Sequence, residues 1–229
     1  SVLLAGLLVT TLLVVNSVRE TRHVARVDFD RLSERMAAEA QRCADRPFYG
    51  IAGLRGLYKA SKSVERAEFR SFVASLDAPR QYRGVTDFGV IKRVARDDLA
   101  TCIPAERSDE APDFTVNAGE ADAASSPRLF VATFVEPSHA ATAKVGADLG
   151  ADPTQRAAIE QAVHSGEPTL EIRAPRSPID RPQALYLLAV YNNGAQPTTP
   201  QEREDALACV VYASVDLPDL LEGVTDTSD

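Results

Sequence analysis

The stretch VTDFGVIKRV, from Val85 to Val94, marks the point at which the sequence changes from helical to extended periodicity. Within it, apolar and polar residues alternate, and branched and aromatic side chains are frequent, which predicts a β-strand. Before it, apolar residues recur at the spacing of an amphipathic helix, as at Phe69, Phe72, Val73 and Leu76. The sequence therefore predicts helices in the N-terminal part of the chain and a sheet that begins near residue 85.

Four further apolar segments predict the other strands of an antiparallel sheet. They are LFVATFVEP from Leu129, TLEIRA from Thr169, ALYLLAVY from Ala184 and ACVVYASV from Ala208. The first is apolar on both faces, which is typical of a central strand. Residues 104–127 are predicted to form a solvated loop with a short strand at 114–116, and residues 192–204 are predicted to form a loop or hairpin.

A helix between the second and third strands is the best-marked element of the chain. Asp152 is a favourable N-cap, Pro153 suits the first helical position, and Gly166 is placed to end the helix. A last helix is predicted at residues 217–224. The order of elements predicts an α+β protein, in which a long N-terminal helix precedes a PAS-like antiparallel sheet with flanking helices.

The N-terminal run from Val2 to Val15 carries no charge, and its only polar residues are two threonines. A membrane-spanning helix needs roughly 20 apolar residues, so we expect residues 1–15 to be the outer part of a transmembrane helix that begins before Ser1. The alternatives are a signal-peptide core and a buried helix. Arginines at positions 19, 22 and 26 follow the run, and since positive charge usually marks the cytoplasmic side, the charges leave the orientation open.

Residues 16–62 are predicted to form a helical stalk, and residues 63–229 a separate domain. From Ala25, apolar residues recur at steps close to the heptad repeat of a coiled coil. The stalk is therefore either one half of a homodimeric coiled coil or a single amphipathic helix packed on its own domain. Pro47 is expected to interrupt it, with a second helix from about Phe48 and with Ser61 or Ser63 as the N-cap of a third.

Composition excludes one broad class of partner. The net charge of -8 and the pI near 5.0 argue against nucleic acid, whose phosphates require a basic surface, and the chain has no tryptophan. The cysteines Cys43, Cys102 and Cys209 are either buried small side chains or include one disulfide. The three histidines form no HExxH motif, and no catalytic or phosphate-binding signature is present, so no cofactor, metal or catalytic residue is predicted.

Polar and aromatic residues on the predicted strands suggest a binding site for a small molecule. His139 and Glu136 lie in VEPSHAAT, directly after a strand, where polar groups commonly fix ligands. Glu171 and the tyrosines of the following strand are expected to converge on the same cavity, although a polar surface loop is the alternative. The predicted ligand-binding residues are Phe134, Glu136, His139, Thr169, Glu171, Tyr186 and Tyr191.

Several spaced blocks of the sequence resemble CHASE domains. They are GLRGLYKASKSVERAEFRSFV, VATFVEP, GADLGADPTQRAAIEQAVHSGEP, LAVYNNGAQPTTPQERED and SVDLPDLLEGV, in that order between residues 51 and 224. The resemblance implies an extracytoplasmic sensor of a membrane histidine kinase or nucleotide cyclase, with residues 63–229 as a PAS-like membrane-distal domain that holds the ligand. It also implies a periplasmic or extracellular location, while the second, membrane-proximal module of the family is not expected within this chain.

The resemblance suggests an adenine derivative as one ligand class, because cytokinin-binding members of the family recognise adenine. In those members an Asp after the central strand contacts the adenine edge, whereas this chain has Glu136 and His139 there. Glu171 replaces a small hydroxyl residue, and Val131 and Ala189 stand where the family often has proline. These departures concern the ligand and not the fold.

Three functions remain open from the sequence. The first is a small-molecule sensor, which predicts a polar cavity near Glu136, His139 and Glu171. The second is a ligand-free dimerisation or adaptor module, which predicts a sheet filled by its own Phe88, Phe130 and Phe134. The third is an extracytoplasmic enzyme, which requires a nucleophile within reach of His139.

Overall fold

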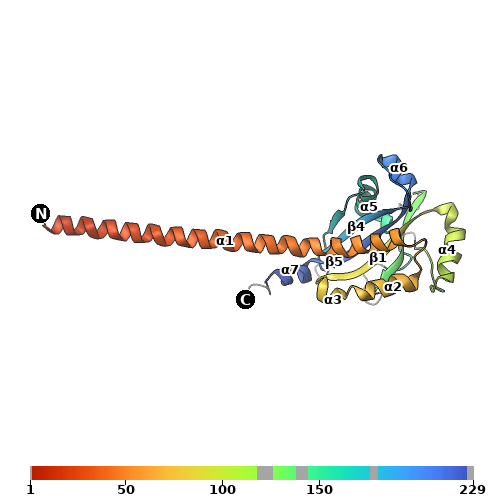
Figure 1. Ribbon diagram of the computed structural model, residues 1–229, viewed down its shortest axis with the longest axis horizontal. Coiled ribbons are helices and arrows are strands. Elements are labelled where there is room, and N and C mark those ends of the chain that lie inside the picture. Colours follow the sequence, from red (N-terminus) through yellow and green to blue (C-terminus); the bar gives the residue numbers. More distant parts are fainter. Residues whose placement is uncertain (1, 118–125, 138–143, 176–179, 226–229) are drawn as a thin grey trace. The chain divides into compact units, whose positions relative to one another are not determined.

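The computed structural model describes the backbone of residues 2–117, 126–137, 144–175 and 180–225, and the side chains among these from residue 31 to residue 222. The chain divides into two compact units, residues 1–42 and residues 43–229. One helix, α1 (Val2–Ala60), contributes to both (Figure 1). Among the described residues, no helix combines the length and the apolar character that crossing a membrane requires.

Helix α1 continues through Pro47, so the predicted interruption there is wrong. A proline inside a helix costs one hydrogen bond and crowds the preceding turn. Pro47 is itself buried, however, and lies in register with Cys43, Ile51 and Leu54, which are also buried. Burial of this continuous apolar stripe offsets the local cost and keeps the helix intact across the proline.

Two short helices, α2 (Arg66–Ser75) and α3 (Ala78–Gln81), connect α1 to the sheet. The prediction of Ser61 or Ser63 as the N-cap of α2 is wrong, because the N-cap position is Glu65, which makes no side-chain capping bond. Instead, the carboxylate of Asp109 accepts from the backbone N–H of Arg66 at 3.1 and 3.2 Å. A residue distant in sequence thus supplies the negative charge that a helix N-terminus favours.

The five strands form one antiparallel sheet, which confirms the predicted α+β class with a PAS-like sheet (Figure 1). They are β1 (Val85–Ala95), β2 (Arg128–Glu136), β3 (Thr169–Arg173), β4 (Gln183–Tyr191) and β5 (Leu207–Asp216). Their spatial order is β2-β1-β5-β4-β3, with antiparallel pairing at every step.

Strand β2 lies at an edge, so its predicted central position is wrong. Its apolar character has a different cause, since both its faces and its outer edge are covered. The backbone N–H of Ala132 donates to the carbonyl of Ala147 at 2.9 Å, and the N–H of Gly146 donates back to Ala132 at 2.7 Å. This pairing protects the edge of β2 in the way a sixth strand would.

The remaining helices occur between the strands. They are α4 (Leu99–Ser108), α5 (Pro153–Ser165), α6 (Pro200–Asp205) and α7 (Leu217–Thr225), with short 3-10 turns η1 (Arg96–Asp98) and η3 (Leu149–Ala151). The caps predicted for α5 are confirmed, because Asp152 accepts from the N–H groups of Thr154 and Gln155 and Gly166 ends the helix in the left-handed region. The predicted last helix is confirmed as α7.

Two segments predicted as loops contain helices. Part of the polar stretch 104–127 belongs to α4, and no strand is present at 114–116, where the described backbone forms only an isolated bridge from Asn117 to Ala147. Helix α6 starts within the predicted loop 192–204 and begins with a capping box, in which Thr199 and Glu202 bond each other's backbone N–H. The Thr-Pro-Gln-Glu sequence carries the signal for this box.

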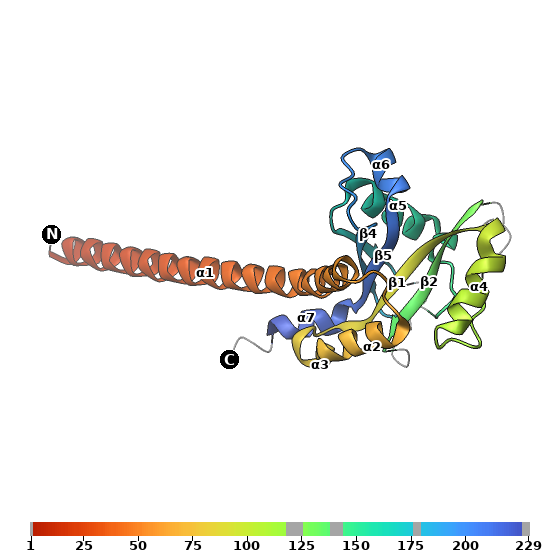
Figure 2. The ribbon, with the colours of Figure 1, turned by 45° about the vertical axis from the view of Figure 1, so that its right-hand side comes forward.

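The two faces of the sheet have different covers. One face packs on α5 through a core of Ile91, Ala132, Leu185, Leu187, Val210, Tyr212 and the apolar residues of α5, and we call it the α5 face. The other is covered by α2 and by the part of α1 that belongs to the second unit, and we call it the α1 face. Phe48 of α1 packs edge-on against Tyr186 at 4.6 Å, and Phe69 of α2 lies 5.4 Å from Phe134. Figure 2 shows α5 and α6 side by side.

Candidate functional site

The residues predicted to bind a ligand lie on both faces of the sheet. Phe134, Glu136 and Tyr186 belong to the α1 face, as their register and partners show. Thr169 and Glu171 pair with Leu187 and Leu185, so they point to the α5 face. His139 lies outside the described residues.

The predicted convergence of Glu136 with Glu171 is therefore wrong. Strands β2 and β3 are the two opposite edges of the sheet, with three strands between them. Tyr191 also has a structural role, because its hydroxyl donates to the carbonyl of Val163 in α5 at 2.7 Å. These residues cannot line one cavity, and each face has to be considered separately.

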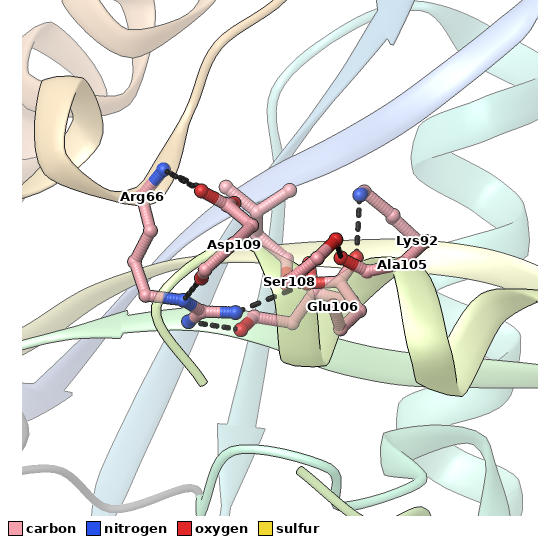
Figure 3. Close-up of polar contacts among 8 residues, drawn as sticks. Arg66, Lys92, Ala105, Glu106, Ser108 and Asp109 are labelled. Carbon is pink, nitrogen blue, oxygen red and sulfur yellow. Dashed lines mark hydrogen bonds and ion pairs between the residues drawn. The ribbon is translucent and has the colours of Figure 1, made fainter. Parts of the chain in front are cut away.

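Phe134 takes part in a buried ionic network on the α1 face. The guanidinium carbon of Arg66 lies 4.6 Å from the centre of the Phe134 ring, and the ammonium of Lys92 lies 5.5 Å from it. Glu106 bonds both cations, with Arg66 at 3.0 Å and Lys92 at 2.6 Å (Figure 3). Arg66 also donates to the carbonyls of Asp109 and Thr133, each at 2.8 Å. Each charge has hydrogen-bonded partners, so the network is suited to fixing α2 and α4 on the sheet.

Helix α1 reaches this network through Tyr58. The Tyr58 hydroxyl is buried and makes no hydrogen bond among the described residues. Burial raises the pKa of Tyr58 well above its ordinary value, and the neighbouring Cys209, Glu106 and Asp109 raise it further. The last turns of α1 thus present a neutral phenol to a charged cluster.

Glu136 contributes to a cavity of about 310 Å³ beside the network. Its carboxylate accepts from Nε of Arg70 at 3.1 Å, and Arg70 also meets Glu110 at 3.4 Å. The lining residues are Arg66, Arg70, Glu110, Ala111, Pro112, Asp113, Phe114, Val135, Glu136 and Val145. The Glu136 side chain is therefore held by α2 within this cavity, on the side of the sheet away from Glu171.

The α5 face carries two adjacent rows of polar side chains in an otherwise apolar core. In one row, Glu171 pairs with Leu185, Leu185 with Ser214, and Ser214 with Asp87. In the next row, Thr169 pairs with Leu187, Leu187 with Tyr212, and Tyr212 with Gly89. We call the buried residues Asp87, Thr169, Glu171, Tyr212 and Ser214 the polar rows.

Tyr212 is, together with Asp87, the most deeply buried residue of these rows. Its ring lies directly over Gly89, where a Cβ atom would be 2.4 Å from the ring. Its hydroxyl makes no hydrogen bond among the described residues, although it lies beside the Asp87 carboxylate without hydrogen-bond geometry to it. Burial raises the pKa of Tyr212 well above its ordinary value, and the charge of Asp87 adds to this. A buried hydroxyl without a partner is costly, so this position calls for an explanation.

Asp87 is held in place by neighbouring hydroxyls. Ser214 Oγ donates to its Oδ1 at 3.1 Å, and Thr86 Oγ1 donates to its Oδ2 at 2.9 Å. Asp87, Tyr212 and Ser214 were not among the ligand-binding residues predicted from the sequence. The available signal was the alternation of Tyr212, Ser214 and Asp216 in the last strand, which places three polar residues on one face.

The remaining chemistry is limited. Cys43, Cys102 and Cys209 are free thiols, so the alternative of one disulfide among them is not borne out. Burial raises the pKa of the Cys209 thiol to about 12, which makes it a poor nucleophile. Among the described residues, no group of three His, Cys, Asp or Glu side chains is arranged to hold a metal ion.

Comparison with known proteins identifies the family. No curated protein matches the chain. A family model described as the CHASE domain matches residues 62–229, which include the whole sheet and all helices from α2 to α7. This model describes a sensor domain and not a catalytic one. The chain therefore belongs to the CHASE domain family, whose members are extracytoplasmic sensor domains of signalling receptors.

Proposed function

We propose that this sensor domain binds a small molecule on the α5 face, over the polar rows, and that the signal leaves the domain through α1. The observation that carries the proposal is the fully buried Tyr212 hydroxyl, which has no hydrogen-bond partner among the described residues. A ligand that pairs with this hydroxyl gains a hydrogen bond in a low-dielectric site, where such a bond is strong.

The α1 face is a weaker candidate for the ligand because its own side chains fill its centre, and its cavity of about 310 Å³ lies beside Glu136 at the β2 edge. Phe88 and Phe134 are buried there, and Phe88 packs against Tyr82 at 5.8 Å. The Arg66 network closes the same face with internally satisfied charges. Phe130, the third phenylalanine predicted to fill the sheet, lies on the α5 face. It is near the start of β2, whereas the polar rows lie nearest to Val135, near the end of β2.

The polar rows favour a ligand that donates hydrogen bonds. Asp87 and Glu171 supply carboxylate oxygens, and the hydroxyls of Thr169, Tyr212 and Ser214 can accept as well as donate. The apolar Leu185 and Leu187 lie between these groups and suit the body of an organic molecule. This combination of apolar walls with few fixed polar groups is the usual composition of small-molecule sites.

Signal transfer requires that the sheet and α1 move together. Phe48 packs on Tyr186 of β4, and Gly50 allows close approach to Phe88 of β1, because a Cβ there would lie 2.7 Å from that ring. A ligand that binds two arrangements of β1 and β4 unequally shifts their populations, and α1 follows. We also propose that residues 1–15 anchor the protein in a membrane and that residues 16–62 act as the stalk.

The test is a thermal shift of the full chain against a panel of adenine derivatives, amines and amino acids. A ligand at about 100 times its dissociation constant adds roughly 2.7 kcal/mol of stability. The shift is expected to shrink strongly in Tyr212→Phe and in Glu171→Gln. Tyr186→Phe is the matched control, because Tyr186 is a buried tyrosine of the same sheet on the opposite face. A ligand whose shift survives in Tyr212→Phe and Glu171→Gln but disappears in Tyr186→Phe places the site on the α1 face instead.

A second candidate function is dimerisation through α1. In the first unit, Leu32 and Met36 are exposed large hydrophobic residues one helical turn apart. A second copy of the chain could cover them in a coiled coil. Sedimentation equilibrium of the wild-type chain and of Met36→Glu tests this, since a dimer formed through α1 loses affinity in the variant. Ala38→Glu adds the same charge at an exposed position on the other side of the helix and serves as the control.

A further inference from the structure

A second cavity lies on the α5 face at the far end of the sheet from the polar rows. Its volume is about 400 Å³, within the usual range for small-molecule sites. Arg93, on its wall, stands six positions along β1 from Asp87, which corresponds to about 20 Å of extended strand. The lining residues are Arg93, Ser126, Pro127, Arg128, Phe130, Arg156, Glu160, Val163, His164 and Glu204.

Positive groups outnumber negative ones in this cavity. Three guanidinium groups, those of Arg93, Arg128 and Arg156, face two carboxylates, and His164 adds a further cation when protonated. The whole chain, in contrast, carries a net charge of -8. A local excess of arginine against an acidic background creates a field that attracts small anions to this cavity.

Arg156 is held in position by its surroundings. Its Nε donates to the carbonyl of Gly150 at 2.8 Å, and its guanidinium lies 5.1 Å from the centre of the Phe130 ring. A Cβ at residue 150 would lie 2.7 Å from Nη2 of Arg156 and 2.8 Å from Phe130, so only glycine leaves room for this stacking. A guanidinium fixed in this way loses little conformational entropy when an anion binds.

The cavity already holds one oxyanion, the carboxylate of Glu204. Its carboxylate lies 2.6 Å from Nε2 of His164, 3.5 Å from Nη1 of Arg128 and 3.9 Å from Nη1 of Arg93. The His164 hydrogen bond, with help from the two arginines, lowers the pKa of Glu204 below its ordinary value. The two arginine contacts are long, and the Arg128 side chain is 58% exposed, so its donors remain accessible to a ligand.

We propose that this cavity is a separate binding site for a small multivalent oxyanion, a polycarboxylate or a phosphate. Arg128 and Arg156 contact the anion through their guanidinium groups, and Val163 and Phe130 contact the carbon skeleton where the anion is organic. The site shares no residue with the polar rows and does not rest on the proposed function. It would give the sensor a second input, or a response to the anion content of its surroundings.

The test is isothermal titration calorimetry of the full chain with citrate and, separately, with inorganic phosphate, at constant ionic strength set by sodium chloride. Saturable binding of at least one anion is expected. Arg128→Gln should weaken it about tenfold to a hundredfold, the loss of one charge-assisted hydrogen bond. Arg80→Gln is the matched control, because Arg80 is also exposed, at 85%, and also makes a single long ion pair, at 3.8 Å to Asp77. This variant should bind as the wild type does.

A gain-of-binding variant makes the test independent of any loss of folding. Glu204→Gln removes the internal carboxylate that competes for Arg93, Arg128 and His164, so the affinity for the anion should rise. Glu171→Gln, in the polar rows, should leave anion binding unchanged. The proposal is overturned if neither anion gives saturable binding, if Arg128→Gln and Arg80→Gln weaken binding equally, or if Glu204→Gln weakens it.

Discussion

Replacing Glu106 by glutamine tests how strongly the Arg66 network holds the domain together. Glu106 is 4% exposed, and its carboxylate pairs with both Arg66 and Lys92. The substitution keeps the size of the side chain but removes its charge. Arg66 then remains buried with two carbonyl partners and the nearby Asp109, and without its ion pair.

The expected loss follows from the burial of each partner. Breaking a buried ion pair by removing one member costs about 3–5 kcal/mol, because the other charge stays buried. Lys92 is 39% exposed, so its pair contributes only about 0–1 kcal/mol. The carbonyl bonds of Arg66 keep the total near the lower limit. We therefore expect Glu106→Gln to cost about 3 kcal/mol, equivalent to about 6–12 °C in Tm for a chain of this size.

Urea unfolding followed by circular dichroism measures this loss. An unchanged m-value shows that the wild type and Glu106→Gln unfold in the same way. Glu110→Gln is the matched control, because Glu110 pairs with Arg70 at 3.4 Å but is 57% exposed. It should change stability by no more than about 0.5 kcal/mol. Combining Arg66→Gln with Glu106→Gln should cost less than the sum of the single changes. A loss below 1 kcal/mol for Glu106→Gln, or strict additivity of the pair, would refute the assignment of a structural role to this network.

Three other predictions concern the sheet. Gly89→Ala should destabilise the domain by about 1–3 kcal/mol in urea unfolding, because the added Cβ would lie 2.4 Å from the Tyr212 ring; no loss would mean that the ring shifts freely. Tyr212→Phe should leave the ligand-free domain as stable as the wild type or more stable, since it removes a buried hydroxyl without a partner; a loss above about 1 kcal/mol would reveal a hydrogen bond. Burial raises the pKa of Cys209 from 9.0 to about 12, so the folded state keeps a proton that the unfolded chain releases, and stability should fall by about 1.4 kcal/mol per pH unit between about pH 9 and about pH 12. Cys209→Ala should show a shallower decline in urea unfolding across that range, and parallel curves for the two proteins would contradict it.

Local signals in the sequence predicted the elements whose structure depends on nearby residues. The caps of α5 at Asp152 and Gly166 act within a few residues of the helix ends, so the sequence pattern located them closely. The five strands were found because their apolar composition extends over whole segments. Helix α6 could also have been found, because its capping box lies within four consecutive residues.

Features that depend on distant residues could not be predicted in this way. Asp109 caps α2 from a position 43 residues away, and no local pattern at Ser61 or Ser63 could show that. The apolar character of β2 indicated a central strand, but the segment at Ala147 covers its edge instead. The predicted ligand site was wrong for the same reason. The order of the strands in the sheet, which no local pattern shows, places Glu136 and Glu171 at opposite edges.

The contacts of α1 with the sheet limit how a signal can leave the domain. Phe48 packs against β4, Gly50 lies against Phe88 of β1, and the buried Tyr58 hydroxyl lies near Glu106 and Asp109, all within three turns of the helix. A helix attached in this way cannot loosen at one contact without disturbing the others, because packed interfaces change between discrete arrangements. Tyr186 lies on β4, whose opposite face carries Leu185 and Leu187 between the polar residues, and Phe88 lies on β1, whose opposite face carries Asp87. A ligand that binds over the polar rows and shifts β1 or β4 therefore acts on the contact of α1 with Phe88 or with Tyr186.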